Sequence, residues 1–121
     1  MRKGHDIAGR LIRLGAESLK LAAQLPKDVA AAHVAKQLGR AATGAGANYE
    51  EARGAESRRD FVHKLGVTEK ELRETSYWIA LVAARWEELA VRTTPISQEV
   101  DELISIVVAS IRTARRNDER P

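Results

Sequence analysis

The chain has 121 residues with 20 lysines and arginines, 17 aspartates and glutamates, a formal net charge of +3 and no cysteine. This length suits a single domain over residues 1–121, and the lack of cysteine excludes disulfides, thiolate metal ligands and a cysteine nucleophile. No apolar run approaches the ~20 residues that span a bilayer, and the N-terminus is charged, unlike a secretory signal, so we expect a cytoplasmic protein with no membrane partner.

Two helices are predicted in the first half of the chain, where apolar residues recur at steps of three and four. The first covers residues 5–24, and Pro26 follows it, which suits the first turn of a second helix over residues 27–53. Gly54 is a suitable stop for that helix. Residues at this spacing form a stripe along one face of each helix. The stripe of the first helix contains Ile7, Leu11, Leu14, Ser18, Leu21 and Leu25, and the stripe of the second contains the smaller Ala31, Val34, Leu38, Ala41, Ala45, Asn48 and Ala52.

Two further helices are predicted in the second half. Ser57 can cap a helix over residues 57–90, and Thr94 with Pro95 predicts a break followed by a helix over residues 95–116. The third stripe contains Phe61, Leu65, Thr68, Leu72, Thr75, Ile79, Val82, Trp86 and Leu89, and the fourth contains Val100, Ile104, Val107, Ile111 and Ala114.

Four amphipathic helices with short connections predict an all-α fold, an antiparallel up-down-up-down four-helix bundle. Apolar residues outside the stripes predict a second interface, and hence self-association. The alternative is that these residues are buried more deeply within one subunit. They are Tyr77 and Trp78 on the third helix and Leu103, Ile106 and Val108 on the fourth.

The stretch TGAGANYEE, residues 43–51, is rich in glycine but does not fit a phosphate-binding loop. Gly39 and Gly44 have the Walker spacing, yet the lysine and the hydroxyl residue that should follow are missing, and Tyr49 occupies the third glycine position of a dinucleotide motif. A glycine costs a helix about 1 kcal/mol relative to alanine, which packing must offset. We therefore expect a thin face on the second helix, against which large residues of the third helix pack.

Polar residues near the stripes predict a structural cluster between the second and third helices. Asn48 falls on the second stripe, where it would need hydrogen-bond partners. A catalytic carboxylate set or a metal site is the alternative, but the Glu-x-x-His pairs of di-iron bundles are absent, so we predict no catalytic, metal or cofactor residues. The predicted cluster consists of Asn48, Glu51, Glu71, Glu74 and Thr75.

Basic residues are concentrated in the first helix, where five oppose two acidic residues over residues 1–24. A basic face can attract an anionic partner such as RNA or DNA, although a solvated helix face explains the same pattern. The candidate nucleic-acid-binding residues are Arg2, Lys3, Arg10, Arg13 and Lys20, followed by Arg112, Arg115 and Arg116.

Residues 37–82 contain a set of spaced residues that is typical of one family. They are Arg40, Ala41, Ala42, Ala47, Asn48, Glu51, Ser57, Phe61, Lys64, Leu65, Glu71, Glu74, Thr75 and Trp78. With these residues the segment resembles the bacterial four-helix bundle family named for open reading frames in intervening sequences of 23S rRNA genes. The sequence departs from the usual Ser-Ile pair of that family at Gly44-Ala45.

The resemblance implies a bundle assembled into a ring, typically a homopentamer, in a family whose members mostly have no established activity. One branch, the accessory variability determinant of diversity-generating retroelements, is similar in fold, binds nucleic acid and partners a reverse transcriptase. Our leading hypothesis is therefore a non-enzymatic, self-assembling scaffold or binding module without a cofactor. The alternative is a nucleic-acid-binding accessory protein that acts through basic helix faces. An enzyme built on Asn48, Glu51 and Glu74 is a third reading, for which nothing selects a reaction.

Overall fold

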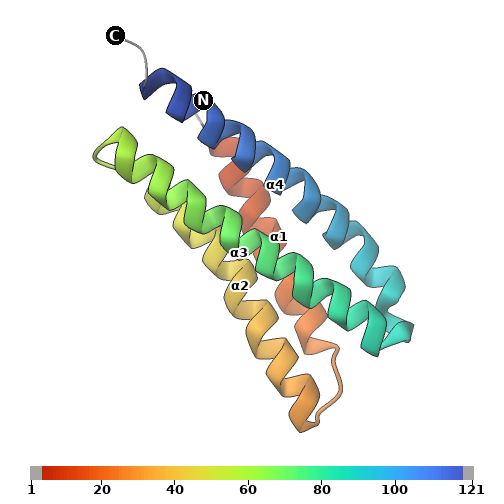
Figure 1. Cartoon of the computed structure of the whole chain (residues 1–121). Coiled ribbons are helices and arrows are strands. Elements are labelled where there is room, and N and C mark those ends of the chain that lie inside the picture. Colours follow the sequence, from red (N-terminus) through yellow and green to blue (C-terminus); the bar gives the residue numbers. More distant parts are fainter. Residues whose placement is uncertain (1–3, 119–121) are drawn as a thin grey trace.

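The computed structural model describes residues 4–118 and contains four α-helices arranged up-down-up-down (Figure 1). No strand occurs in this range, and none of its helices is both long and apolar enough to cross a bilayer. The prediction of an all-α four-helix bundle is confirmed. The elements are α1 (His5–Ala23), α2 (Val29–Arg53), α3 (Arg58–Arg85), a short 3₁₀ helix η1 (Glu87–Leu89) and α4 (Ala90–Asp118).

Side-chain caps set the starts of α2 and α3. The Asp28 carboxylate accepts a hydrogen bond from the backbone N–H of Ala31 at 2.9 Å, and the Ser57 hydroxyl accepts one from the N–H of Asp60 at 3.0 Å. Each bond satisfies a donor that the first turn of a helix leaves free. The predicted cap at Ser57 is confirmed, whereas α2 begins two residues later than predicted, because Asp28 caps it and Pro26 stays in the connection.

The connection between α3 and α4 differs from the prediction. The third helix ends at Arg85 instead of residue 90, since Trp86 leaves the helical conformation (φ −122°, ψ 78°) and is buried in the core. The fourth helix then begins at Ala90, so the predicted break at Thr94 and Pro95 is wrong. Both threonine hydroxyls there donate to the backbone oxygen of Ala90 and do not cap a new helix, and Pro95 lies inside α4.

The predicted core stripe of α4 is confirmed at Val100, Val107, Ile111 and Ala114 and is wrong at Ile104. Leu103 is fully buried and belongs to the core, while Ile104 is only half-buried. Both residues continue a helical repeat from Val100, so spacing alone could not separate them. Leu103 therefore contributes to the core and not to a second interface. The other residues of the predicted interface vary, since Ile106, Val108 and Trp78 are half-buried and Tyr77 is exposed.

The thin face of α2 packs mainly against α1, which corrects the expectation that it receives large residues of the third helix. A Cβ atom at Gly46 would lie 3.6 Å from the Cβ of Leu11, and one at Gly39 would lie 3.2 Å from Leu19 Cδ2. Gly44 alone of these three glycines faces α3. The small residues therefore let α1 and α2 approach closely.

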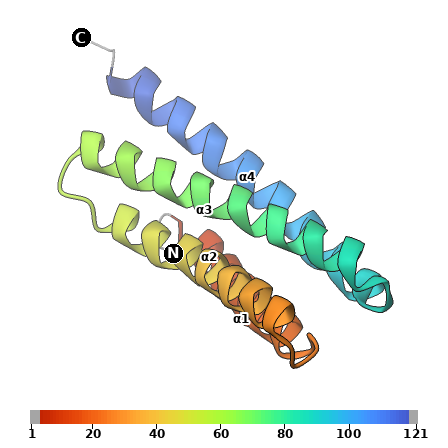
Figure 2. The same cartoon turned by 60° about the horizontal axis from the view of Figure 1, so that its bottom comes forward.

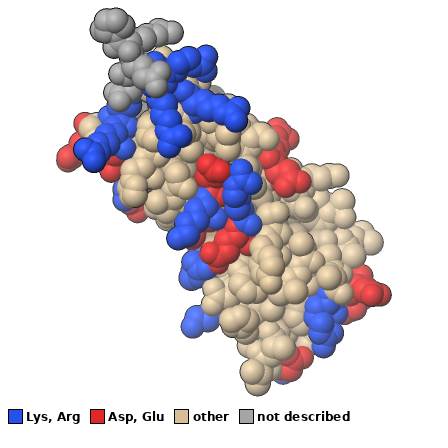
Figure 3. Space-filling view, in the orientation of Figure 1, with Lys and Arg blue, Asp and Glu red and all other residues tan. Residues whose placement is uncertain are grey.

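The four helices are not equally associated. Figure 2 shows α3 between α2 and α4, with α1 beside α2, and α1 and α4 contact each other far less than the other neighbouring pairs do. The start of α1, the end of α4 and the α2–α3 connection lie at one end of the bundle (Figure 1). Lys and Arg side chains gather at that same end in the space-filling view, whereas much of the opposite half is uncharged (Figure 3).

Candidate functional site

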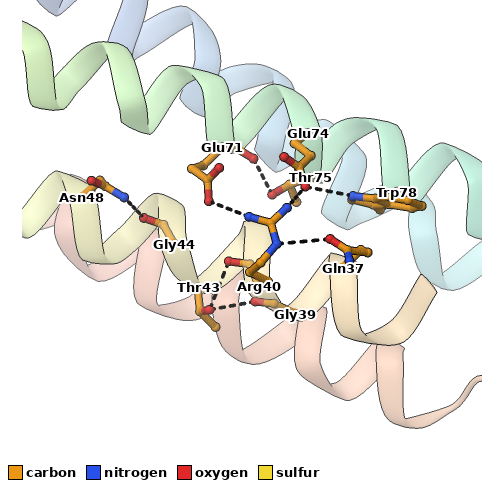
Figure 4. Close-up of polar contacts among 10 residues, drawn as sticks. All are labelled: Gln37, Gly39, Arg40, Thr43, Gly44, Asn48, Glu71, Glu74, Thr75 and Trp78. Atoms are coloured by element: carbon orange, nitrogen blue, oxygen red, sulfur yellow. Dashed lines mark hydrogen bonds and ion pairs between the residues drawn. The ribbon is translucent and has the colours of Figure 1, made fainter. Parts of the chain in front are cut away.

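An ion network joins α2 to α3 at the middle of the bundle (Figure 4). Arg40 extends from α2 to two carboxylates of α3. Its Nη2 donates to Glu74 Oε2, and its Nη1 lies 3.6 Å from Glu71 Oε2. Its Nε donates to Gln37 Oε1 at 3.1 Å, and Trp78 Nε1 donates to Glu74 Oε2 at 3.2 Å. The guanidinium and both carboxylates thus have partners within the protein.

Gly44 provides the space that Glu71 occupies. A Cβ atom at this position would overlap Glu71 Oε2 and would lie 3.4 Å from its Cδ. The Glu71 side chain is only 12% exposed, so its carboxylate lies against the backbone of α2 where a larger residue would exclude it. The absence of a side chain at Gly44 therefore has a local structural consequence.

The threonines of the α3 stripe satisfy their hydroxyls within their own helix. Thr75 Oγ1 donates to the backbone oxygen of Glu71 at 2.8 Å, and Thr68 Oγ1 donates to that of Lys64 at 3.0 Å. Both residues are fully buried. They fill the core without leaving an unpaired polar group.

The predicted single cluster is divided in the structure. Asn48 is half-buried, not at a core position, and its Nδ2 donates to the backbone oxygen of Gly44 at 2.9 Å, one turn earlier. Glu51 is exposed and accepts a hydrogen bond from Lys64 Nζ at 2.7 Å, which raises the pKa of that lysine. Asn48 and Glu51 make these separate contacts and therefore do not join Glu71 and Glu74.

The network is therefore a link between two helices. Its carboxylates are engaged by Arg40 and Trp78, which leaves no arrangement of a nucleophile and a base to assign. Residues 4–117 contain no group of three or more His, Asp or Glu side chains placed to hold a metal ion.

The basic residues of α1 are largely engaged by acidic neighbours. Arg10 Nε and Nη2 donate to the two carboxylate oxygens of Glu99 on α4 at 2.9 and 2.7 Å, and Nη2 lies 3.1 Å from Glu102. The hydrogen bond to Glu99 raises the pKa of Arg10, and the same bond lowers the pKa of Glu99. Lys20 pairs with Glu17 at 3.1 Å.

Of the other candidates on the first helix, Arg13 is exposed. Arg2 and Lys3 lie outside the described residues. The first helix therefore presents less free positive charge than its composition suggests, because Arg10 links α1 to α4.

The basic residues of α4 are exposed, and α3 adds two more beside them. Arg112, Arg115 and Arg116 lie on the last turns of α4, and the antiparallel packing brings the first turn of α3 next to them. Arg58 Nη1 lies 3.4 Å from the backbone oxygen of Ala114 on α4, which it reaches as a donor. Arg59 lies next in the same turn.

The start of α3 and the end of α4 border a small pocket of about 210 Å³ that is open to solvent. Sequence reasoning missed Arg58 and Arg59. The pair of arginines directly after the Ser57 cap was the available signal, since an up-down-up-down bundle places that cap beside the end of the fourth helix. The pocket is lined by Arg58, Arg59, Val62 and Arg115.

Comparison with known proteins gives a family and a fold neighbour. A family model described as 23S rRNA-intervening sequence protein matches residues 4–109. A crystal structure of a protein of unknown function from the S23 ribosomal protein family of Bacteroides thetaiotaomicron is 26% identical, with a TM-score of 0.77. The match covers 87% of this chain and 97% of that one. The comparison with curated proteins gives no match.

Proposed function

Because the chain belongs to the 23S rRNA-intervening sequence protein family, we propose that it is a non-enzymatic, self-associating helical bundle that serves as a scaffold or binding module. The neighbour from Bacteroides is itself described as having unknown function. The proposal therefore depends on the surface of this chain.

An exposed apolar stripe on α1 is the observation that carries self-association. Ile12, Ala16, Leu19 and Ala23 follow one another at steps of four, three and four, which places them on one face of the helix. Ile12 is 68% exposed and Leu19 is 50% exposed. Contiguous apolar surface of this kind is typical of a protein interface. The stripe replaces Leu103, which is buried, as the basis for expecting a second interface.

The mass of the protein in solution tests this proposal. We expect light scattering at micromolar concentration to give a multiple of the 13.3 kDa chain mass, five times that mass if the ring is a pentamer. Ile12→Glu should reduce the mass to that of one chain, because a charge cannot be buried without a partner. Val91→Glu is the matched control, since Val91 is 84% exposed and lies on α4, outside the stripe. A wild-type mass of one chain, or equal dissociation by both variants, would contradict the proposal.

Nucleic-acid binding is a second candidate, favoured by the exposed arginines at the end of α4. Among the described side chains none of Arg112, Arg115 and Arg116 forms an ion pair, whereas Arg10 and Lys20 do. We therefore place the candidate surface at the end of the bundle where α3 begins and α4 ends. A reverse transcriptase as partner remains a prediction that co-purification and mass spectrometry would test.

The salt dependence of the affinity for nucleic acid tests whether the exposed arginines bind phosphate groups. Binding through phosphate contacts should weaken at least about tenfold between about 50 and about 200 mM salt, because each neutralised phosphate releases counterions. Fluorescence anisotropy with labelled single-stranded RNA and DNA measures this change. An affinity that does not change with salt would count against it.

A further inference from the structure

We propose that the pocket lined by Arg58, Arg59, Val62 and Arg115, which we term the arginine pocket, binds a phosphate group. The group would come either from a free phosphate ester, such as a nucleotide, or from the backbone of a nucleic acid. The inference rests on the nucleic-acid-binding function proposed above. The experiment below distinguishes a failure of the pocket from a failure of that function.

The pocket has the size and construction of an anion site. Its volume of about 210 Å³ far exceeds the ~10–15 Å³ needed to hold one water molecule. Two arginines come from the first turn of α3 and one from the last turns of α4, so arginine side chains from two helices line one open space. Val62, one turn further along α3, adds an apolar wall.

The arginines of the pocket have no ion-pair partner among the described side chains. The nearest acidic residues in the sequence around Arg58 and Arg59 are Glu56, which precedes α3, and Asp60 in its first turn. The exposed arginines that α3 and α4 contribute at this end are Arg58, Arg59, Arg112, Arg115 and Arg116.

The placement of two of these arginines is electrostatically unfavourable. The start of a helix carries partial positive charge from its free N–H groups, so cations there are destabilising. Arg58 and Arg59 occupy this unfavourable position on α3. Asp60 in the same turn opposes this effect, and a bound anion would oppose it further.

The types of residue suit an oxyanion such as phosphate. A guanidinium presents a planar fork of donors that matches two oxygens of a phosphate or a carboxylate, which makes arginine the preferred residue for bidentate recognition of such groups. Arg58 is held by its contact with the backbone oxygen of Ala114, and we assign it a positioning role. Arg59 and Arg115 form no hydrogen bond with a described residue, and we assign them as the direct ligands.

A titration with inorganic phosphate and pyrophosphate tests the pocket directly. We compare the full chain with Arg59→Gln/Arg115→Gln and with a matched control, Lys36→Gln/Arg92→Gln, which removes the same charge from exposed positions elsewhere. In NMR spectra of the wild type, the backbone amide signals of residues 57–62 and 112–116 should shift as phosphate or pyrophosphate is added. The pocket variant should bind these anions at least about tenfold more weakly, and the control should bind them as the wild type does. Equal loss in both variants, or no shift with pyrophosphate, would overturn the proposal.

The source of the phosphate is distinguished by repeating the comparison with a labelled single-stranded oligonucleotide and with adenosine monophosphate. Binding of the free phosphates without the oligonucleotide supports the pocket and contradicts the nucleic-acid function. Oligonucleotide binding that both variants weaken equally leaves that function standing and overturns the pocket. Thermal melting by circular dichroism identifies a variant that fails to fold, and Arg59→Lys, which keeps the charge but loses the fork, should then bind phosphate more weakly than the wild type.

Discussion

Gly44 and Glu71 should be energetically coupled, and the substitution Gly44→Ala tests this. The added methyl group would overlap Glu71 Oε2. The carboxylate must therefore move and lose its contact with Arg40 Nη1, which lies 3.6 Å away. Gly66 on α3 is a matched control, because a Cβ atom there would meet nothing within 4 Å.

The magnitude follows from two opposing effects. Replacing a glycine by alanine inside a helix stabilises it by about 0.8–1.0 kcal/mol. At Gly66 this gain should appear in full. At Gly44 the loss of the ion pair between Glu71 and Arg40 should cost about 1 kcal/mol. The cost is no larger because the Arg40 side chain is half-exposed, and water weakens ion pairs at the surface. The free energy of unfolding should therefore barely change in Gly44→Ala, whereas in a Glu71→Ala background the same substitution should stabilise by about 1 kcal/mol.

A double-mutant cycle measured by urea denaturation checks the coupling. Protein concentration must be held constant, since self-association would change the apparent stability. The free energies of unfolding of the four proteins in the cycle are compared with that of Gly66→Ala. The comparison requires that the dependence of this free energy on urea concentration is the same in all of them. If Gly44→Ala stabilises the wild type as much as Gly66→Ala does, or if the coupling is below about 0.3 kcal/mol, the two residues are independent and the reasoning is wrong.

Three further predictions concern the core, a cap and an ion pair. Leu103→Ala should cost about 2–5 kcal/mol in a denaturation experiment and Ile104→Ala clearly less, and equal costs would refute the corrected stripe of α4. Asp28→Ala should cost about 1 kcal/mol through loss of the α2 cap, and an unchanged midpoint would show that the cap contributes nothing. Because Arg10 lowers the pKa of Glu99 below 4.5, the stability from this pair is complete above that value and is lost as pH falls through the lower folded-state pKa. Unfolding midpoints at about pH 3 and about pH 7 should therefore differ less in Arg10→Gln than in the wild type, and an identical difference would contradict this.

Local signals in the sequence were sufficient where one residue decides one local feature. Ser57 predicted the start of α3, because a hydroxyl at that position satisfies a free N–H of the first turn. Local signals were insufficient where two neighbouring residues fit the same core position. Leu103 and Ile104 fit the helical repeat equally well, and only the packing of α4 decides between them. The end of α3 likewise depends on the burial of Trp86, a tertiary effect that the proline downstream did not indicate.

The candidate sites depended on pairing between distant segments, which spacing does not encode. Arg10 belonged to the predicted basic face of the first helix, yet Glu99 and Glu102 on α4 neutralise it. Arg58 belongs to the arginine pocket only because the bundle places the start of α3 beside the end of α4. The identity of each charged residue was visible in the sequence, but its partner followed from topology.

The sparse contact between α1 and α4 has a consequence for how the molecule can open. Two helices that touch little, joined by the ion pairs of Arg10, form the seam that separates at the lowest cost. Opening along this seam exposes the inner residues of both terminal helices, Leu14 and Val100 among them, while α2 and α3 stay packed. Two copies opened in this way could exchange a terminal helix, so the seam is the expected site of domain swapping.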